Sequence, residues 1–149
     1  MRVTHLSIVT PGATRFDGDV ELAIAPGSAG DLGALAQHAP LLTTLRVGVV
    51  RASAPGPVVG EAAIGSALIG GRVEFAIDGG FMEVLPERVI ILTDRALSKE
   101  EIDVMATREE LRRAAEALAQ KRGADDAAER RAVAWAQAKL EVKHVPAGE

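Results

Sequence analysis

The sequence contains no cysteine and no tyrosine, and only 3% of its 149 residues are aromatic. Without cysteine the chain forms no disulfide, thiolate metal site or cysteine nucleophile, and it fits a reducing compartment. Alanine, valine, leucine and glycine therefore have to build the core. A chain of this length buries a substantial core, so we expect one domain, or a small domain with an appendage.

A basic excess and a long apolar run are also absent. The formal net charge is -4 and the isoelectric point is near 5.4, so nucleic acid is not an expected partner. No apolar run approaches the ~20 residues of a membrane-spanning helix. The start, MRVTHLSIVTPG, alternates polar and apolar residues, unlike a signal peptide. We expect no membrane insertion, and a location in the cytoplasm or on a cytoplasmic membrane face.

The residue groupings typical of enzymes and metal sites are missing as well. His5, His38 and His144 include no pair at the i, i+4 spacing that places two imidazoles on one helix face. Ser66 lacks the glycine two residues later that a nucleophile elbow requires. Because no acid, base and nucleophile can be brought together from the pattern, we predict a noncatalytic protein without a metal.

The first 96 residues are predicted to be short β-strands separated by glycine and proline. The expected strands are residues 3–9, 20–25, 41–46, 48–52, 73–77, 81–85 and 89–93. Many short strands with regular turns and no helix between them indicate a sandwich or a barrel. Asp78-Gly79-Gly80 is expected to form a hairpin turn, because glycine adopts positive φ without steric cost.

Residues 53–71 carry a single charge, Glu61. They fit a long hairpin whose strands extend the sheet, and they equally fit a surface that a partner covers, because an uncharged exposed β tip invites edge pairing.

After Ala96 the apolar period becomes helical. Ser98 and Glu101 have the spacing of a capping box, and the next residues up to 122 contain no glycine or proline. One apolar stripe is expected at i, i+3, i+4 and i+7, formed by Leu111, Ala114, Ala115 and Leu118.

A second helix is expected after a break at residues 123–125. Asp126 and Glu129 suggest its capping box, and it runs to about residue 143. The short connection predicts an antiparallel hairpin. The residues that face each other across the hairpin are mostly alanine. On the second helix they include Val133, Trp135, Ala136 and Leu140. Such a seam buries little apolar area, which makes the hairpin a candidate for movement.

The order of these features resembles a known family. AGDLGALAQHAPLLTTLRVGVV, then FAIDGGFMEVLPERVIILTDRA, then EEID before a helical hairpin are similar to the epsilon subunit of bacterial F-type ATP synthases. The resemblance implies an N-terminal β-sandwich of about ten short strands over residues 1–96. An antiparallel two-helix C-terminal hairpin and tail would occupy residues 97–149. Relatives usually turn sooner than this chain does at residues 55–71.

The resemblance implies a noncatalytic rotor subunit in the central stalk, peripheral on the cytoplasmic face of the cell membrane. Its sandwich would bind the gamma subunit and the c ring, and so couple proton-driven rotation to ATP synthesis. Asp31, in the turn GDLG, matches an acidic position near the c-ring loops, although it also fits a local turn-capping aspartate. The segment expected near gamma and the ring contains His38, Ala39, Pro40, Leu41 and Leu42.

In the same family the hairpin inhibits ATP hydrolysis when it extends into the head of alpha and beta subunits. Basic residues would then meet an acidic segment of beta; the candidates are Arg108, Arg112, Arg113, Arg130, Arg131, Lys139 and Lys143. Each of them also fits an ordinary solvated face that forms i, i+4 pairs.

Some members bind ATP through I-D-x-x-R-A. Ile102 and Asp103 agree with this motif and Arg113 matches a later position, but Ala106 and Thr107 replace the arginine and alanine. Without this arginine the triphosphate loses a bidentate cationic partner, so we predict weak or absent ATP binding and no cofactor.

An alternative from another class is a standalone β-sandwich that binds a ligand and dimerises through a helical tail. A carbohydrate-binding platform usually presents aromatic rings, and the single tryptophan lies on a predicted helix.

Overall fold

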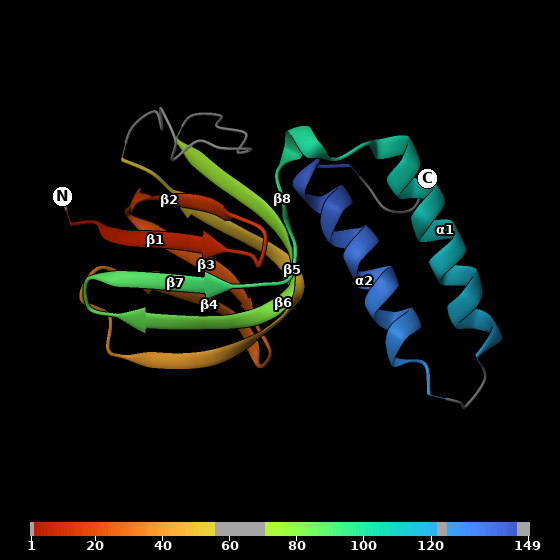
Figure 1. The fold of residues 1–149 in the computed structure, drawn as a ribbon, viewed down its shortest axis with the longest axis horizontal. Coiled ribbons are helices and arrows are strands. Elements are labelled where there is room, and N and C mark those ends of the chain that lie inside the picture. The colour runs from red at the N-terminus through yellow and green to blue at the C-terminus, as the bar shows by residue number, and fades with distance from the viewer. Residues whose placement is uncertain (1, 56–70, 122–124, 146–149) are drawn as a thin grey trace.

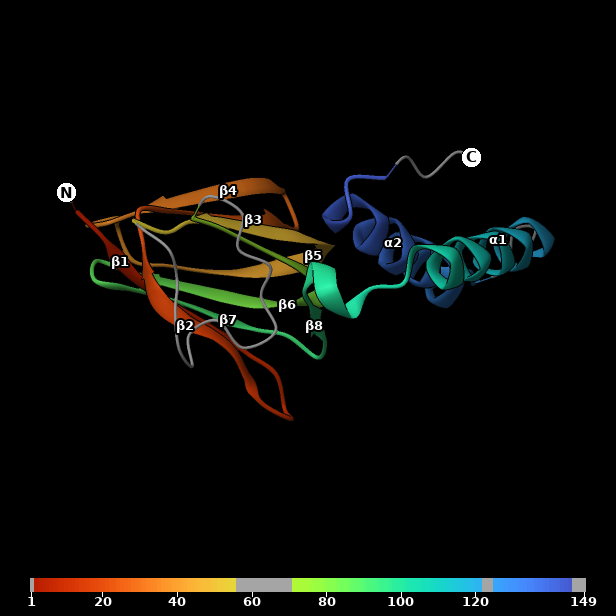
Figure 2. The same ribbon diagram turned by 90° about the horizontal axis from the view of Figure 1, so that it is seen from above.

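The computed structural model describes residues 2–55, 71–121 and 125–145. They form a β-sandwich followed by two antiparallel helices at one end of it, with α2 between the strands and α1 (Figure 1). Seen from above, the strands lie in two layers and the hairpin projects away from them (Figure 2). The sandwich and hairpin that the sequence predicts are confirmed.

Eight strands occur in this described part of the chain. They are β1 (Thr4–Val9), β2 (Thr14–Val20), β3 (Leu22–Gly27), β4 (Gly30–Leu35), β5 (Leu41–Ser53), β6 (Arg72–Leu85), β7 (Arg88–Leu92) and β8 (Ala96–Leu97). The strand order is β2-β1-β7-β6-β5-β3-β4, and β8 pairs with β6. All pairs are antiparallel except β1 with β7.

The two longest strands belong to both layers, and this corrects two expectations. Each of β5 and β6 joins two segments that the sequence predicts as separate short strands. Asp78-Gly79-Gly80 is not a hairpin turn, because β6 continues through it with φ of 72° at Gly79 and 124° at Gly80. The glycines bend the strand instead of ending it. A Cβ on Gly80 would lie 2.0 Å from the carbonyl oxygen of Leu92.

The main core lies between the two layers. Strand β1 shows the expected period of two, with Leu6 and Ile8 buried and the residues between them partly exposed. Phe16, Phe75 and Ile77 are the largest side chains that join them there. This core is rich in valine and alanine, as the low aromatic content predicts.

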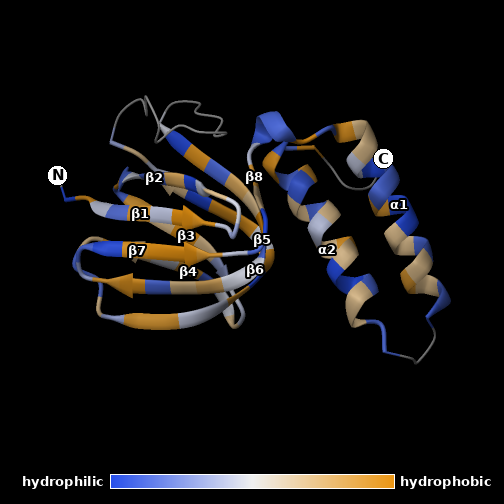
Figure 3. Ribbon diagram, in the orientation of Figure 1, coloured by the Kyte–Doolittle hydropathy of each residue, from blue (hydrophilic) through white to orange (hydrophobic). Residues whose placement is uncertain are grey.

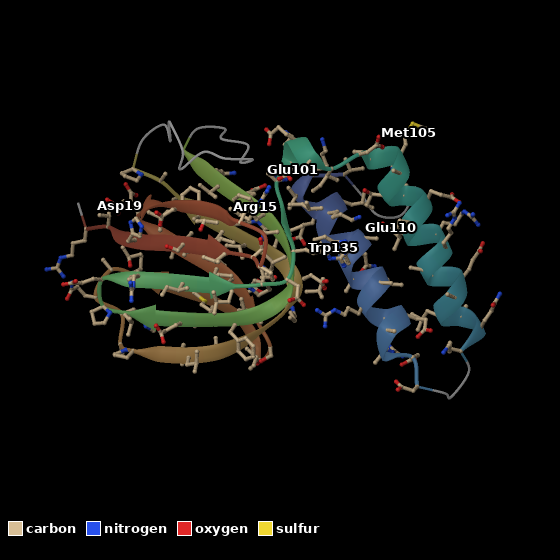
Figure 4. All side chains as sticks on the ribbon, in the orientation of Figure 1. Arg15, Asp19, Glu101, Met105, Glu110 and Trp135 are labelled. Atoms are coloured by element: carbon tan, nitrogen blue, oxygen red, sulfur yellow. The ribbon has the colours of Figure 1, made fainter. Side chains whose placement is uncertain are left out.

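A second apolar cluster joins α2 to the sandwich. Trp135, Ala138 and Val142 of α2 pack against Val49 of β5 and Ala76 of β6. Trp135 therefore faces the strands and not the seam between the helices, as Figure 4 also shows. The sequence could not make this distinction because an apolar stripe does not specify whether a strand or a helix packs on it.

The helical part contains η2 (Lys99–Glu101), a 3-10 turn, then α1 (Val104–Gln120) and α2 (Ala127–Val142). The Ser98–Glu101 capping box exists, but it opens η2, whereas Asp103 caps α1 by accepting a hydrogen bond of 2.9 Å from the Ala106 amide. The expected box at Asp126 is wrong, because its side chain caps nothing. The neighbouring carboxylate of Asp125 accepts from Ala127 instead, at 3.2 Å.

The seam between the helices follows the predicted stripe only in part. Ala114 is buried, Leu111 and Leu118 are half-buried, and Ala115 is exposed. On α2, Ala136 and Leu140 are fully buried. Among the described helices, none is long and apolar enough to cross a membrane.

Several expectations concern residues outside the described ranges: Glu61 and Ser66, the role of most of segment 53–71, and the helix break at residues 123–124. The two ends of segment 53–71 lie together, because the Ala54 amide donates a hydrogen bond of 2.6 Å to the Gly71 carbonyl.

Candidate docking surface and hairpin contacts

An apolar row crosses the outer face of the layer formed by β1, β7, β6 and the start of β5. Phe81 lies directly opposite Thr44 on one side and Leu92 on the other, and Leu92 is in register with Val9. Phe81 is 55% exposed and Leu92 is 50% exposed. Their chain neighbours Met82 and Ile91 point into the core, as the alternation of a strand requires.

The next row extends this surface. Leu42, which is 69% exposed, lies opposite Glu83, and Glu83 lies opposite Ile90. We call Val9, Leu42, Phe81, Ile90 and Leu92 the outer apolar face. Figure 3 shows hydrophobic colour over most of β7, which contributes two of these residues. Outward positions of such a layer are usually polar, so this face is unusual for a surface in contact with water.

A cleft of about 580 Å³ adjoins the outer apolar face on the side of the hairpin. Val9, Phe81 and Leu92 line it from the strands, and Asp78 and Arg131 line it where α2 meets β6. The outer apolar face and the contact between hairpin and sandwich are therefore neighbours.

A histidine cluster lies on the same outer face, at the edge of the layer where β1 pairs with β2. His5 donates from Nε2 to Asp17 at 2.6 Å and from Nδ1 to Asp19 at 3.0 Å, and Ser7 donates to Asp17 at 2.8 Å. Both ring nitrogens can donate only if the imidazole is protonated. The hydrogen bond to Asp19 raises the pKa of His5 above 6.5, against partial burial, and Asp17 raises it further. The bonds from Ser7 and His5 lower the pKa of Asp17 below 3.8.

Asp31 lies in β4 and not in the turn that the sequence suggests. The turn between β3 and β4 is formed by residues 28–29. Asp31 accepts a hydrogen bond of 2.7 Å from Arg46, which also donates to the Gly27 carbonyl at 2.7 Å. It also lines a cleft together with Gln137 of α2, so it lies at the end of the sandwich that faces the hairpin.

His38 lies at the opposite end of β4. Its Nδ1 is 2.7 Å from the carbonyl oxygen of Ala39, and the Gln37 amide donates to Pro86 in the turn between β6 and β7. Six residues of strand span roughly 20 Å, so the structure separates Asp31 from His38. Of the five residues expected near gamma and the ring, only Leu42 belongs to the outer apolar face.

Asp78 is the main polar contact between the sandwich and the hairpin. Its side chain is buried, and Oδ2 accepts from Nε and Nη2 of Arg95 at 3.0 and 2.8 Å. Oδ1 accepts from Nε of Arg131 at 3.0 Å, and the Asp78 carbonyl accepts from Nη2 of Arg131 at 2.8 Å. Arg95 also stacks on Trp135, 4.3 Å from the ring centroid.

Other ion pairs join the two parts at their edges. Arg15 of β2 pairs with Glu101 of η2, and both are labelled in Figure 4. Near the end of α2, Arg51 donates to Glu141 at 2.6 Å, and His144 lies 3.0 Å from Glu74.

The remaining candidate basic residues fall into two groups. Arg112 and Arg113 pair with Glu109 on their own helix, and Arg130 pairs with Asp126, as on a solvated face. Hydrogen bonds from Arg112, and to a smaller extent from Arg113, lower the pKa of Glu109 to about 2.

Lys139 is different. It is buried, lies 2.5 Å from Glu110 of α1 and approaches the ring of Trp135. Lys143, at the end of α2, is half-buried. A role of any of these residues in inhibition stays a prediction.

The residues of the degenerate ATP motif are engaged locally. Asp103 caps α1, and its carbonyl accepts from the Thr107 hydroxyl at 2.6 Å. Ile102 is buried against the sandwich in the second apolar cluster. Arg113 is held by Glu109, 3.1 Å away.

Comparison with known proteins identifies the family. The model of the ATP synthase delta/epsilon chain β-sandwich domain matches residues 3–99. An ATP synthase epsilon chain of Pelotomaculum thermopropionicum is 38% identical over 120 residues, 80% of this chain and 79% of the relative. One from Laribacter hongkongensis is 36% identical over 143 residues, 94% and 92% of the two chains. The chain belongs to the ATP synthase epsilon-chain family.

Solved structures share the fold of this chain. A chain of the Euglena gracilis mitochondrial ATP synthase, in a structure of OSCP, F1 and c-ring, matches with a TM-score of 0.62 at 21% identity, covering 97% of this chain and 79% of that one. A chain of the Tetrahymena thermophila mitochondrial central stalk and c-ring matches with a TM-score of 0.52 at 16% identity, over 66% and 68%.

Sequence reasoning missed the outer apolar face and the contact of Asp78 with Arg131. A usable signal for the first was present, because residues 81–85 and 89–92 carry apolar side chains at both parities of the strand. No local signal pairs Asp78 with Arg131, which is 53 residues later.

Proposed function

We propose that the chain is a noncatalytic central-stalk subunit of the rotor of a proton-translocating ATP synthase, peripheral on the cytoplasmic face of the membrane. The observation that carries the proposal is the outer apolar face. In this proposal the face binds the gamma subunit, and the sandwich also contacts the loops of the c ring, so that the subunit couples rotation to ATP synthesis.

Three points support gamma as the occupant. The chain belongs to the epsilon-chain family, and the solved structures that share its fold include a central stalk with a c-ring. Phe81 and Leu92 lie side by side and half exposed, which suits the buried centre of an interface better than a solvated surface. Around them stand Glu83 and Thr44, which suit a polar rim.

For the c ring, the proposal keeps Asp31, His38, Pro40 and Leu41. Because Asp31 and the other three lie at opposite ends of β4, they would contact separate parts of the assembly. Asp31 is held by Arg46, so a basic loop of the ring would compete with that arginine.

The proposal also assigns the hairpin to inhibition of ATP hydrolysis by contact with the alpha and beta subunits. Its support is that α1 packs on α2, while α2 alone carries the apolar contact with the two long strands. A hairpin docked through one helix face can leave the sandwich without breaking the core between the layers.

Co-purification with the gamma subunit tests the proposal. We expect the full chain to form a stable complex with gamma. We also expect a reconstituted ATP synthase with the full chain to hydrolyse ATP more slowly than an ATP synthase with a chain truncated after Leu97. This truncation keeps β8. Absence of a complex with gamma would contradict the stalk role. Equal hydrolysis rates would contradict only the inhibitory role of the hairpin.

A further inference from the structure

We propose that Asp78 is an electrostatic latch that holds the helical hairpin on the sandwich. The latch is a property of the folded chain; only its link to ATP hydrolysis rests on the proposed function. It lies on β6 where Gly79 and Gly80 bend the strand, so its carboxylate reaches the hairpin from a position that the backbone fixes.

The latch has one carboxylate and two guanidinium groups from different elements. Arg95 comes from the segment between β7 and β8 and belongs to the sandwich, whereas Arg131 comes from the first part of α2. Asp78 is 7% exposed, and both of its oxygens accept. Charge-assisted hydrogen bonds in such a partly dry site are stronger than those at an open surface.

Neutralising Asp78 has two effects that act in the same direction. It weakens the bonds to both arginines, and it leaves two positive groups beside each other without the negative charge between them. The Asp78 carboxylate is buried, whereas the side chains of Arg95 and Arg131 are each 54% exposed, so loss of this half-buried contact costs more than loss of a fully exposed pair. Moving the hairpin away separates Arg131 from Arg95 and relieves the repulsion, so the expected response is undocking of the hairpin.

The second polar contact, at the other end of α2, provides a comparison. Glu141 pairs with Arg51 at a similar distance. The arginine is partly exposed in both contacts, but the Glu141 side chain is 54% exposed whereas that of Asp78 is 9% exposed. Exposed pairs contribute little because water and salt screen them. The asymmetry predicts that the end of α2 near Asp78 controls docking.

Thiol labelling tests the latch. The natural chain has no cysteine, so Ala138→Cys places a single thiol in the apolar cluster between α2 and the strands, where Ala138 is 3% exposed. A thiol at this position reacts only when the hairpin undocks or the chain unfolds. Its labelling rate therefore follows the undocked population even when that population is small.

In this background we compare Asp78→Asn, Arg131→Met and Glu141→Gln. The first two are expected to raise the labelling rate at least about tenfold, equivalent to about 1.4 kcal/mol, and Glu141→Gln less than about threefold. Arg131→Met removes only the contact of Asp78 with the hairpin, because the pair of Asp78 with Arg95 within the sandwich stays intact.

A thiol in the core of the sandwich separates undocking from unfolding. Ala23→Cys, at a fully buried position of β3, should label at an unchanged rate when Arg131→Met is added. An unchanged rate at position 138 in both Asp78→Asn and Arg131→Met overturns the latch. An equal rise at positions 23 and 138 also overturns it, because the effect would then be global. If the latch opens as expected but the hydrolysis rate of the reconstituted complex stays the same, the regulatory part of the proposed function fails and the latch stands.

Discussion

Arg95 of the sandwich and Trp135 of α2 stack on each other, with the guanidinium carbon 4.3 Å from the centroid of the indole ring. Trp135 is the only tryptophan in the chain and is 4% exposed. One residue therefore combines an apolar contact with β5 and β6, a cation–π contact, and an intrinsic fluorescence signal at the boundary between the two parts.

Replacing this residue should weaken the hairpin more than the sandwich. Trp135→Ala removes the largest side chain of the second apolar cluster and is expected to cost about 3 kcal/mol. Thermal melting followed by far-UV circular dichroism should show loss of helix at a lower temperature than loss of strand. A single transition shifted as one unit would contradict this expectation.

The histidine cluster predicts a pH dependence of stability. The pKa of His5 is raised, so its contribution is complete below 6.5 and is lost as pH rises through the pKa of the folded state. The pKa of Asp17 is lowered, so its contribution is present above 3.8 and is lost as pH falls through the pKa of the folded state. The cluster should stabilise most between these two values.

Urea unfolding of the natural chain and of His5→Gln over this pH range measures the effect. The difference in unfolding free energy should be largest at mildly acidic pH and smaller on either side. A difference that does not change with pH would show that the cluster does not titrate as the geometry implies.

Gly80 should be hard to replace. In Gly80→Ala the new Cβ would meet the Leu92 carbonyl oxygen at 2.0 Å, and φ of 124° is unfavourable for any side chain. We expect a loss of more than about 1 kcal/mol in the free energy of unfolding. Gly12→Ala is the control, since nothing lies within 4 Å of its Cβ. Equal unfolding free energies for the two variants would contradict the role of Gly80 at the bend.

ATP binding is expected to be weak or absent. Ala106 stands where the motif has arginine, Asp103 is used in capping α1, and Arg113 is paired with Glu109. Calorimetric titration of the full chain with ATP should give no measurable heat at micromolar nucleotide. Saturable binding in that range would show that another cation replaces the missing arginine.

The sequence predicts the two-part organisation because the two halves use different periods. Leu6 and Ile8 alternate as a strand does, and Ala114 falls on the predicted helical stripe. Prediction from the sequence fails where one local pattern is compatible with two structures. Gly79 and Gly80 would suit a hairpin turn, but the strand continues because both halves of β6 find partners on β5.

The candidate site was less accessible to sequence reasoning. Asp31 and His38 are seven positions apart, yet an intervening strand carries them to opposite ends of the sandwich. Phe81 and Leu92 become one surface only through the pairing of β6 with β7. Asp78 and Arg131 meet only when α2 docks, a contact that no period in either segment specifies.

The affinity of the full chain for the gamma subunit tests the central claim most directly, with Phe81→Ser compared to Leu35→Ser. Leu35 is a matched control because it is 57% exposed and lies on β4 in the other layer. We predict that Phe81→Ser weakens binding at least about thirtyfold, as for a residue at the centre of an interface, and that Leu35→Ser leaves the affinity within about twofold. Equal affinities for the two variants would contradict docking of gamma on the outer apolar face.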